Sequence, residues 1–435
     1  MTSTPKVVRL SCPSQNYAWG KVGNDSLVAQ LARGHGHKVD PAQPYAELWM
    51  GTHPNGPAML CNKDHSTSLR AYLGTDDQAK TLLNSQVYVT FQGELPFLFK
   101  VLSIAKALSI QAHPDKALAT TLHRQFPTIY KDPNHKPEMA LALTPFEALC
   151  GFRDPAAIVA FCRTLPPLAQ LLGTDVVQAL EEAVSAQGGT NPAEGNLKAA
   201  LRALFERLMK SSPEAVETCI RELLMLKDTA PDGTRVVLDL MARLHQQFPG
   251  DVGCLCVFVL NNVHLIPGEA IFLGANEPHA YLSGDCIECM ATSDNVVRAG
   301  LTPKFKDVDV LLNMLTYEHG AVEKRIMRGE PTSDDPTAGF LVTKYDPPIS
   351  EFTVLHIQAK TAGTENTMAP VAGPSLLLVT QGSGRLSINH MKSVESFELR
   401  PGFVYFIAAD TSTTVERDRD SPDDLECYRA YCVVE

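Results

Sequence analysis

The chain repeats one short pattern twice, as PGEAIFLGAN at residues 267–276 and as PGFVYFIAAD at residues 401–410. Each copy opens with a Pro-Gly pair, which is typical of a turn. A short apolar run follows and ends in a small, polar corner, which indicates a buried strand. The two copies are therefore expected to be the same strand of two related β structures.

Strands that start at Pro-Gly turns in this way are typical of cupin (jelly-roll) barrels. We therefore expect a mainly β protein with two such barrels and a helical domain. When the copies are aligned, His279 falls opposite Thr413, so only the first copy keeps an imidazole. The first barrel is predicted to bind a metal, and the C-terminal barrel to be a degenerate, metal-free copy.

The residue pattern changes from β-like to helical and back to β-like, which divides the chain into parts. Short β-like runs dominate the first 150 residues, for example 7–10, 86–91 and 97–104. From Asp154-Pro155, an N-cap followed by a proline suited to the first helical position, the spacing becomes helical. A β pattern resumes at 255–260.

We therefore predict four segments and one linker. They are a first part of the catalytic cupin domain (1–152), a helical domain (153–252) broken by a polar linker (187–192), a second part of the catalytic domain (253–329) and a degenerate C-terminal barrel (330–435).

Composition excludes several classes of protein. Among 435 residues, 38 Lys and Arg stand against 49 Asp and Glu, a net charge of −11, which argues against nucleic acid or an anionic membrane as partner. The N-terminus shows no signal peptide, and no apolar stretch is long enough to span a membrane. The 11 cysteines are scattered and fit reduced thiols. We expect a cytoplasmic monomer that acts on a small molecule.

The segment 108–113, LSIQAH, alternates apolar and polar residues. As a strand it places Ser109, Gln111 and His113 on one face, where an amide oxygen and an imidazole can reach one ion. A solvated face of an edge strand explains the same alternation equally well.

Two further clusters supply oxygen and nitrogen ligands. Pro137 fixes the backbone before Glu138, whose carboxylate suits Zn²⁺, and His279 follows a proline where the barrel mouth is expected. Each residue alone reads as an ordinary loop or structural residue. Together Gln111, His113, Glu138 and His279 form a mixed N/O ligand set.

The run 284–304 contains the remaining candidates. Cys286 and Cys289 form a lone CxxC whose thiols face oppositely on a strand, so they are weak metal ligands. Glu288 lies between apolar neighbours and could be a general base with a raised pKa, or part of a hydrogen-bond network. Lys100 interrupts another apolar run and needs an anion, either a protein carboxylate or a phosphate.

These motifs closely resemble those of the type I phosphomannose isomerases. The resemblance covers nearly the whole chain and is densest in 15–20, 45–53, 95–100, 108–115, 134–142 and 278–304. Those motifs are long and uninterrupted, so they are specific. The helical block and the C-terminal barrel match only loosely.

The resemblance implies a cupin fold, one zinc ion per chain and interconversion of mannose 6-phosphate and fructose 6-phosphate, which feeds GDP-mannose synthesis and glycosylation. It places the zinc ligands on the four residues named above and the essential arginine on Arg298. The pocket positions it implies are Ser109, Lys100, Lys136 and Lys304.

For the mechanism we expect proton transfer through a cis-enediol. Arg298, Glu288 and Lys136 are the catalytic candidates, and Ser109, Lys100 and Lys304 the substrate-binding ones. His135 and Asp294 remain rivals of Glu288 as the base. An Fe(II) cupin oxidoreductase and a non-catalytic sugar-binding barrel are the alternative functions.

Overall fold

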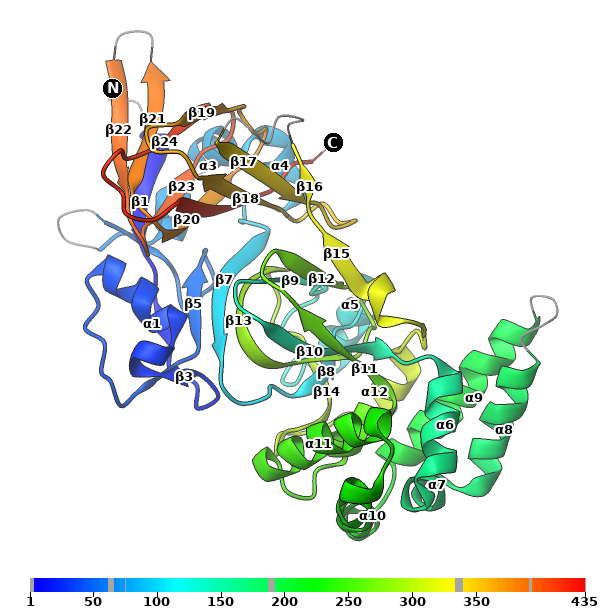
Figure 1. Ribbon diagram of the computed structural model, residues 1–435. Coiled ribbons are helices and arrows are strands. Elements are labelled where there is room, and N and C mark those ends of the chain that lie inside the picture. The colour runs from blue at the N-terminus through cyan, green and yellow to red at the C-terminus, as the bar shows by residue number, and fades with distance from the viewer. Residues whose placement is uncertain are drawn as a thin grey trace.

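The computed structural model describes most of the chain. The described residues are 4–61, 66–74, 76–186, 192–332, 339–390 and 393–434. Figure 1 shows three parts in a row: the C-terminal strands at one end, a first barrel in the middle and a group of helices at the other end. The predicted fold class, mainly β with a helical domain, is confirmed.

The first barrel is built from one 11-stranded sheet. Its strands are β2 (Ser14–Gln15), β5 (Glu47–Met50), β7 (Phe97–Ile104), β8 (Ile110–Ala112), β9 (Glu138–Ala142), β10 (Phe146–Phe152), β11 (Leu260–Leu265), β12 (Glu269–Leu273), β13 (His279–Ala291), β14 (Val297–Gly300) and β15 (Ile326–Arg328). The helical segment therefore lies between β10 and β11, which pair with each other.

Strand β13 holds the barrel together because it pairs on both sides along its length. Its first residues pair with β10 and β8, and the residues from Gly284 onward pair with β7, with β9 alongside from Cys286. The change occurs at Gly284, which has a φ of +110°. A Cβ there would lie 2.5 Å from the carbonyl oxygen of Pro145, so the bend requires glycine.

We expect Gly284→Ala to destabilise the protein by at least ~2 kcal/mol, since the side chain meets rigid backbone and a left-handed φ. Denaturant unfolding measures the loss. Gly195→Ala is the matched control, because nothing lies within 4 Å of a Cβ built at Gly195. Equal stability of the two variants would contradict this account of the bend.

The C-terminal strands form two sheets that enclose a second apolar core. The 8-stranded sheet contains β16 (Glu330–Pro331), β17 (Phe340–Tyr345), β18 (Thr353–Ala359), β25 (Leu425–Tyr431), β20 (Ser375–Gln381), β23 (Val404–Ile407), β1 (Val7–Ser11) and β6 (Met59–Leu60). The 4-stranded sheet contains β19 (Glu365–Met368), β24 (Thr413–Arg417), β21 (Gly384–His390) and β22 (Ser393–Leu399). The first strand of the chain thus pairs with strands near its end.

The internal repeat has the same geometry in both copies. Each Pro-Gly turn places glycine in the left-handed region, Gly268 at φ +90° and Gly402 at φ +87°, and leads into β12 or β23. Each copy also ends on a left-handed polar residue, Asn276 at φ +64° and Asp410 at φ +54°. Asn and Asp tolerate this conformation better than most residues, which explains the polar corner.

Between the two halves of the first barrel, the described residues form six α-helices, which lie at the end of the molecule opposite the C-terminal strands (Figure 1). They are α6 (Pro155–Thr164), α7 (Pro166–Leu172), α8 (Thr174–Ser185), α9 (Pro192–Met209), α10 (Pro213–Leu226) and α11 (Asp232–Gln247). The side chain of Asp154 caps α6 as predicted, accepting from the backbone N–H of Ala156. Residues 187–191 of the predicted linker lie outside the described residues.

Two predicted strands are wrong. Residues 86–91 lie in and just beyond helix α4 (Ser85–Thr90), which Asn84 caps and which buries only Val87. Most of 255–260 lies in a 3₁₀ helix, η4 (Val252–Phe258), fully buried except at its first residue. Because the run 255–260 is apolar and buried on all sides, it has no periodicity that separates a strand from a helix. For 86–91 the cap at Asn84 was the signal that distinguishes a helix.

The remaining described elements are short. They are α1 (Leu27–Ala32), α2 (Leu69–Leu73), α3 (Asp76–Leu83), α5 (Lys116–Gln125), α12 (Val308–Met314), β3 (Lys21–Val22), β4 (Pro44–Tyr45), η1 (Gly23–Asp25), η2 (Arg33–His35), η3 (Lys227–Thr229) and η5 (Val322–Arg325).

Among the described helices, no single one is long and apolar enough to cross a bilayer. Only α6 and α7 taken together reach the required length and composition, and the chain bends by 115° between them.

Helix η2 packs against the C-terminal barrel and carries a largely buried histidine, His35. Burial lowers the pKa of His35 from 6.5 to about 4, with His37 and Arg9 adding to the effect and a backbone hydrogen bond at Leu10 opposing it. A Cβ on the neighbouring Gly34 would lie 2.3 Å from the carbonyl oxygen of Pro401, which shows how closely η2 meets the second Pro-Gly turn.

We expect acid to weaken this contact. Between pH 6.5 and 4 the unfolded chain binds a proton at His35 that the folded chain does not, so stability falls as pH falls through this window, by at most about 3 kcal/mol. Denaturant unfolding of His35→Leu should show a flatter pH dependence than the unsubstituted chain. His264→Leu, at an exposed histidine, is the control. Parallel pH profiles for the His35 variant and the unsubstituted chain would contradict the prediction.

Candidate metal centre

Three of the four predicted ligands converge inside the first barrel. His113, Glu138 and His279 offer ligand atoms that all lie within 4.8 Å of one another, and all three side chains are buried. The Nε2 atom of His279 lies 2.9 Å from Oε1 of Glu138, and that of His113 lies 3.5 Å from Oε2. One cation can contact all three groups from this position.

The barrel strands explain this convergence. Glu138 begins β9 directly after Pro137, His279 begins β13, and His113 follows the last residue of β8. Strand β13 pairs with Gln111 of β8 at His279 and with Glu138 of β9 at Met290, near its other end. Pairing alone does not bring Glu138 to His279, so the closed shape of the barrel must do so.

The polar atoms of the cluster suit a bound cation. Nε2 of both histidines and Oε2 of Glu138 are buried and have no hydrogen-bond partner. Each Nδ1 faces a backbone carbonyl, that of Asn295 for His113 (2.6 Å) and that of Glu277 for His279 (2.9 Å). This arrangement fixes the tautomer that leaves Nε2 free as a ligand. Three buried lone pairs facing one point without a donor fit a metal ion.

Gln111, the fourth predicted ligand, lies beside this cluster. Its backbone pairs with His279 on one side and with Arg298 on the other. Directly paired residues point to the same face of a sheet, so the amide lies on the face that carries the imidazole. Its Oε1 is 3.4 Å from the hydroxyl of Ser109, which can donate to it.

The charges around Glu138 keep it ionised. Burial alone raises the pKa of this carboxyl, but Lys136, with Nζ 3.6 Å from Oε2, and the two histidines more than reverse that effect and hold it well below the usual range. Burial and Lys136 lower the pKa of His113 to about 4. A carboxylate and a neutral imidazole are the forms that bind a metal ion.

Lys100 and Glu288 form a buried pair further along the barrel. They are opposite each other on β7 and β13, with Nζ 3.0 Å from Oε2 of Glu288, and Glu47 adds a second carboxylate at 3.3 Å. The anion that Lys100 was expected to need is therefore a protein carboxylate. Burial raises the pKa of Glu288 although Lys100 opposes it.

The rival bases are tied to other groups. His135 contacts Glu351 at 2.5 Å, and Asp294 is half-exposed with Oδ1 3.3 Å from Nε2 of His53. His53 is buried, and its Nδ1 accepts from the backbone N–H of Asn55. Sequence reasoning did not single out His53 as a site residue, because nothing in the motif around it indicates a contact with Asp294.

Tyr281 is a second residue that sequence reasoning missed. Its hydroxyl donates to Oε1 of Glu138 at 3.5 Å. A signal existed: Tyr281 is two residues beyond His279 on a strand, so alternation places both side chains on one face.

The remaining candidates lie on and after β14. Arg298 is half-buried, and burial lowers the pKa of its guanidinium. Lys304 follows β14 with an exposed side chain and makes none of the ion pairs found among the described residues. Cys286 and Cys289 are both buried in different apolar cores on opposite faces of β13, so they do not form a metal site.

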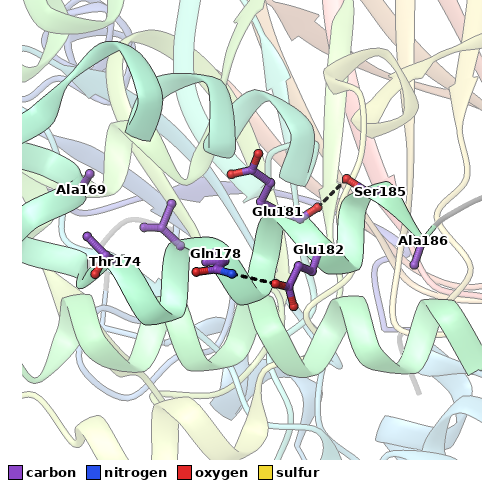
Figure 2. A pocket seen from close by; sticks show the side chains of 8 residues that line it. Ala169, Thr174, Gln178, Glu181, Glu182, Ser185 and Ala186 are labelled. Atoms are coloured by element: carbon purple, nitrogen blue, oxygen red, sulfur yellow. Dashed lines mark hydrogen bonds between the residues drawn. The ribbon is translucent and has the colours of Figure 1, made fainter.

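One surface pocket lies near this cluster, and another lies on the helical domain, away from it. One of about 560 Å³ is lined by His53, Asn134 and Glu351, next to residues named above. Another of about 810 Å³ lies on α7 and α8, where Figure 2 shows Gln178 donating to Glu182. None of the candidate ligands lines that second pocket.

Comparison with known proteins gives consistent matches. The family model for the phosphomannose isomerase type I catalytic domain matches residues 7–155, that for the helical insertion domain 171–260, and that for the C-terminal region 345–391. A mannose-6-phosphate isomerase of Mus musculus is 43% identical, with 99% of this chain and 100% of the relative covered. That of Emericella nidulans is 41% identical, with 98% and 96% covered.

Solved structures show the same similarity. A point mutant of phosphomannose isomerase from Salmonella typhimurium is 28% identical with a TM-score of 0.80, covering 99% of this chain and 100% of its own. A mannose 6-phosphate isomerase bound with zinc and yttrium has a TM-score of 0.79 at 28% identity and the same coverage. With three family models in chain order and relatives above 40% identity over nearly the whole length, this chain belongs to the type I phosphomannose isomerases.

Proposed function

We propose that this chain interconverts mannose 6-phosphate and fructose 6-phosphate through a cis-enediol, with one zinc ion held by Gln111, His113, Glu138 and His279. The observation that carries the proposal is the set of three buried ligand atoms without partners. Relatives named mannose-6-phosphate isomerase support the substrate. When bound, zinc supplies a Lewis acid that polarises the substrate oxygen at C1 or C2.

Glu288 is our candidate for the base that moves the proton between C2 and C1. It is buried on β13 and has a raised pKa, as a base working near neutral pH requires. Residues on one face of paired strands alternate, and the register of β13 with β9 places Glu288 on the face that carries Glu138. Lys100 fixes the carboxylate by its 3.0 Å contact.

The basic groups around the cluster would hold the anionic parts of the substrate. Arg298 lies on β14 and pairs with Gln111 of β8. Its guanidinium can bind phosphate with two N–H groups or stabilise the negative charge that develops on the enediolate. Lys136, Ser109 and Lys304 are the further contacts that we propose for the phosphate. Phosphate binding would orient the reacting carbons.

A coupled assay on the purified, zinc-loaded chain tests this function. It measures the fructose 6-phosphate that forms from mannose 6-phosphate. We expect turnover with mannose 6-phosphate and none with unphosphorylated mannose. Binding of the sugar phosphate without turnover would overturn the proposal in favour of a non-catalytic barrel.

We further propose that the enzyme is a cytosolic monomer that supplies GDP-mannose synthesis and glycosylation. The free state of all 11 cysteines supports a reducing compartment. The domains that we propose are a split catalytic domain (1–152 and 253–329), a helical domain (153–252) and a C-terminal barrel (330–435). Strands β1 and β6 of the first segment complete the 8-stranded sheet of that barrel.

A further inference from the structure

The C-terminal barrel contains a buried cation that the proposed reaction does not use. Arg429 lies on β25 and is 1% exposed. Its cross-strand neighbours, Leu355 and Leu377, belong to the apolar core between the two sheets, so its side chain faces that core. A guanidinium in such a place is costly unless its charge and its N–H groups are matched.

The surrounding side chains satisfy only some of the hydrogen-bond donors of the Arg429 guanidinium. Nη2 donates to the hydroxyl of Ser375 at 2.9 Å, whereas Nε and Nη1 have no hydrogen-bond partner. In the part of the chain that the structure describes, Arg429 forms no ion pair with a carboxylate, and Tyr431 is the one ionisable neighbour that affects it. Burial lowers its pKa to about 10, so the guanidinium stays charged at neutral pH.

Thr413 is a second unmatched donor in the same barrel. It is 2% exposed, and its Oγ1 has no partner. Ser375 pairs with Ile407, the last residue of β23, and Thr413 begins β24 after the loop that follows, so these groups lie at the same end of the barrel. In the internal repeat, Thr413 takes the position that His279 has in the first barrel.

We propose that Arg429, with Ser375 and Thr413, binds a small monovalent anion such as chloride inside the C-terminal barrel. These buried groups are a cation and two hydroxyls that can donate, which is the chemistry an anion needs. One guanidinium balances one negative charge, so a phosphate dianion would leave a buried excess. The first barrel presents free acceptors to a cation, and its degenerate copy presents free donors to an anion.

Diffraction from crystals grown in bromide tests the site directly, because bromide scatters anomalously and replaces chloride. We expect one anomalous peak within hydrogen-bond distance of Nε and Nη1 of Arg429, and no peak there in Arg429→Met crystals. Water alone at this position would overturn the proposal.

Thermal unfolding in chloride, compared with gluconate at the same ionic strength, gives the second readout. We expect chloride to raise the Tm by about 2–4 °C, as binding to the folded state alone requires. Arg429→Met should lose this dependence, and Arg385→Met, at an exposed arginine of the same barrel, should keep it. A bromide peak without any chloride effect on Tm would mean an adventitious ion only and would also overturn the proposal.

Discussion

His279→Ala is expected to lose bound zinc and turnover together, the largest effect that the structure predicts. The substitution removes one of three buried ligand groups and leaves the carboxylate of Glu138 without its 2.9 Å neighbour. Loss of even an indirect partner of a metal ligand costs about 10–100-fold in affinity or activity, so loss of a ligand should exceed ~100-fold. Zinc per chain and turnover of mannose 6-phosphate are measured on the same preparation.

The control for this substitution is His264→Ala. His264 lies on β11 of the same barrel with an exposed side chain, so its removal should leave zinc content and turnover unchanged. Full turnover of the His279 variant after removal of all metal would end the metal hypothesis.

Glu288→Gln is expected to keep zinc and lose about 10²–10⁴-fold in turnover, the range that general acid–base catalysis contributes. The amide has the shape of the carboxylate but cannot take up the proton. Lys100 keeps Glu47 as a partner at 3.3 Å, so the buried cation is not left unpaired. Circular dichroism and zinc analysis confirm that the variant is folded and loaded.

Asp294→Asn and His135→Gln distinguish the rival bases in the same assay. If Glu288 is the base, these two variants should lose much less turnover, because Asp294 pairs with His53 and His135 with Glu351. Near-normal turnover of Glu288→Gln with zinc retained would exclude Glu288 as the base. The base would then be the rival residue whose variant is inactive.

Much of the fold could be predicted because its signals are local. The Pro-Gly turns and the cap at Asp154 each follow from neighbouring residues, and each is found in the structure. Of the two wrong strands, 86–91 did have a local signal, the N-cap at Asn84, which the sequence reading passed over, whereas 255–260 had none. The helical form of 255–260 depends on what packs around it, which a short apolar run does not encode.

Two kinds of information predicted the candidate site. The alternation of residues on a strand placed Gln111 and His113 on one face, and the family resemblance implied the full set of zinc ligands. Convergence of His113, Glu138 and His279 needs strands far apart in sequence to pair through β13, and local pattern does not give that register. The contacts of Glu47 with Lys100 and of His53 with Asp294 are of the same kind. They arise from tertiary packing, so no motif could reveal them.

Anomalous diffraction at the zinc absorption edge, from crystals of the zinc-loaded chain, tests the central claim most directly. The proposed site predicts a single strong anomalous peak from one zinc ion. It should lie within bonding distance of Nε2 of His113, Nε2 of His279 and the carboxylate of Glu138, with the amide oxygen of Gln111 as the fourth ligand. A barrel without a peak at this position, or a zinc ion bound elsewhere in the protein, would contradict it.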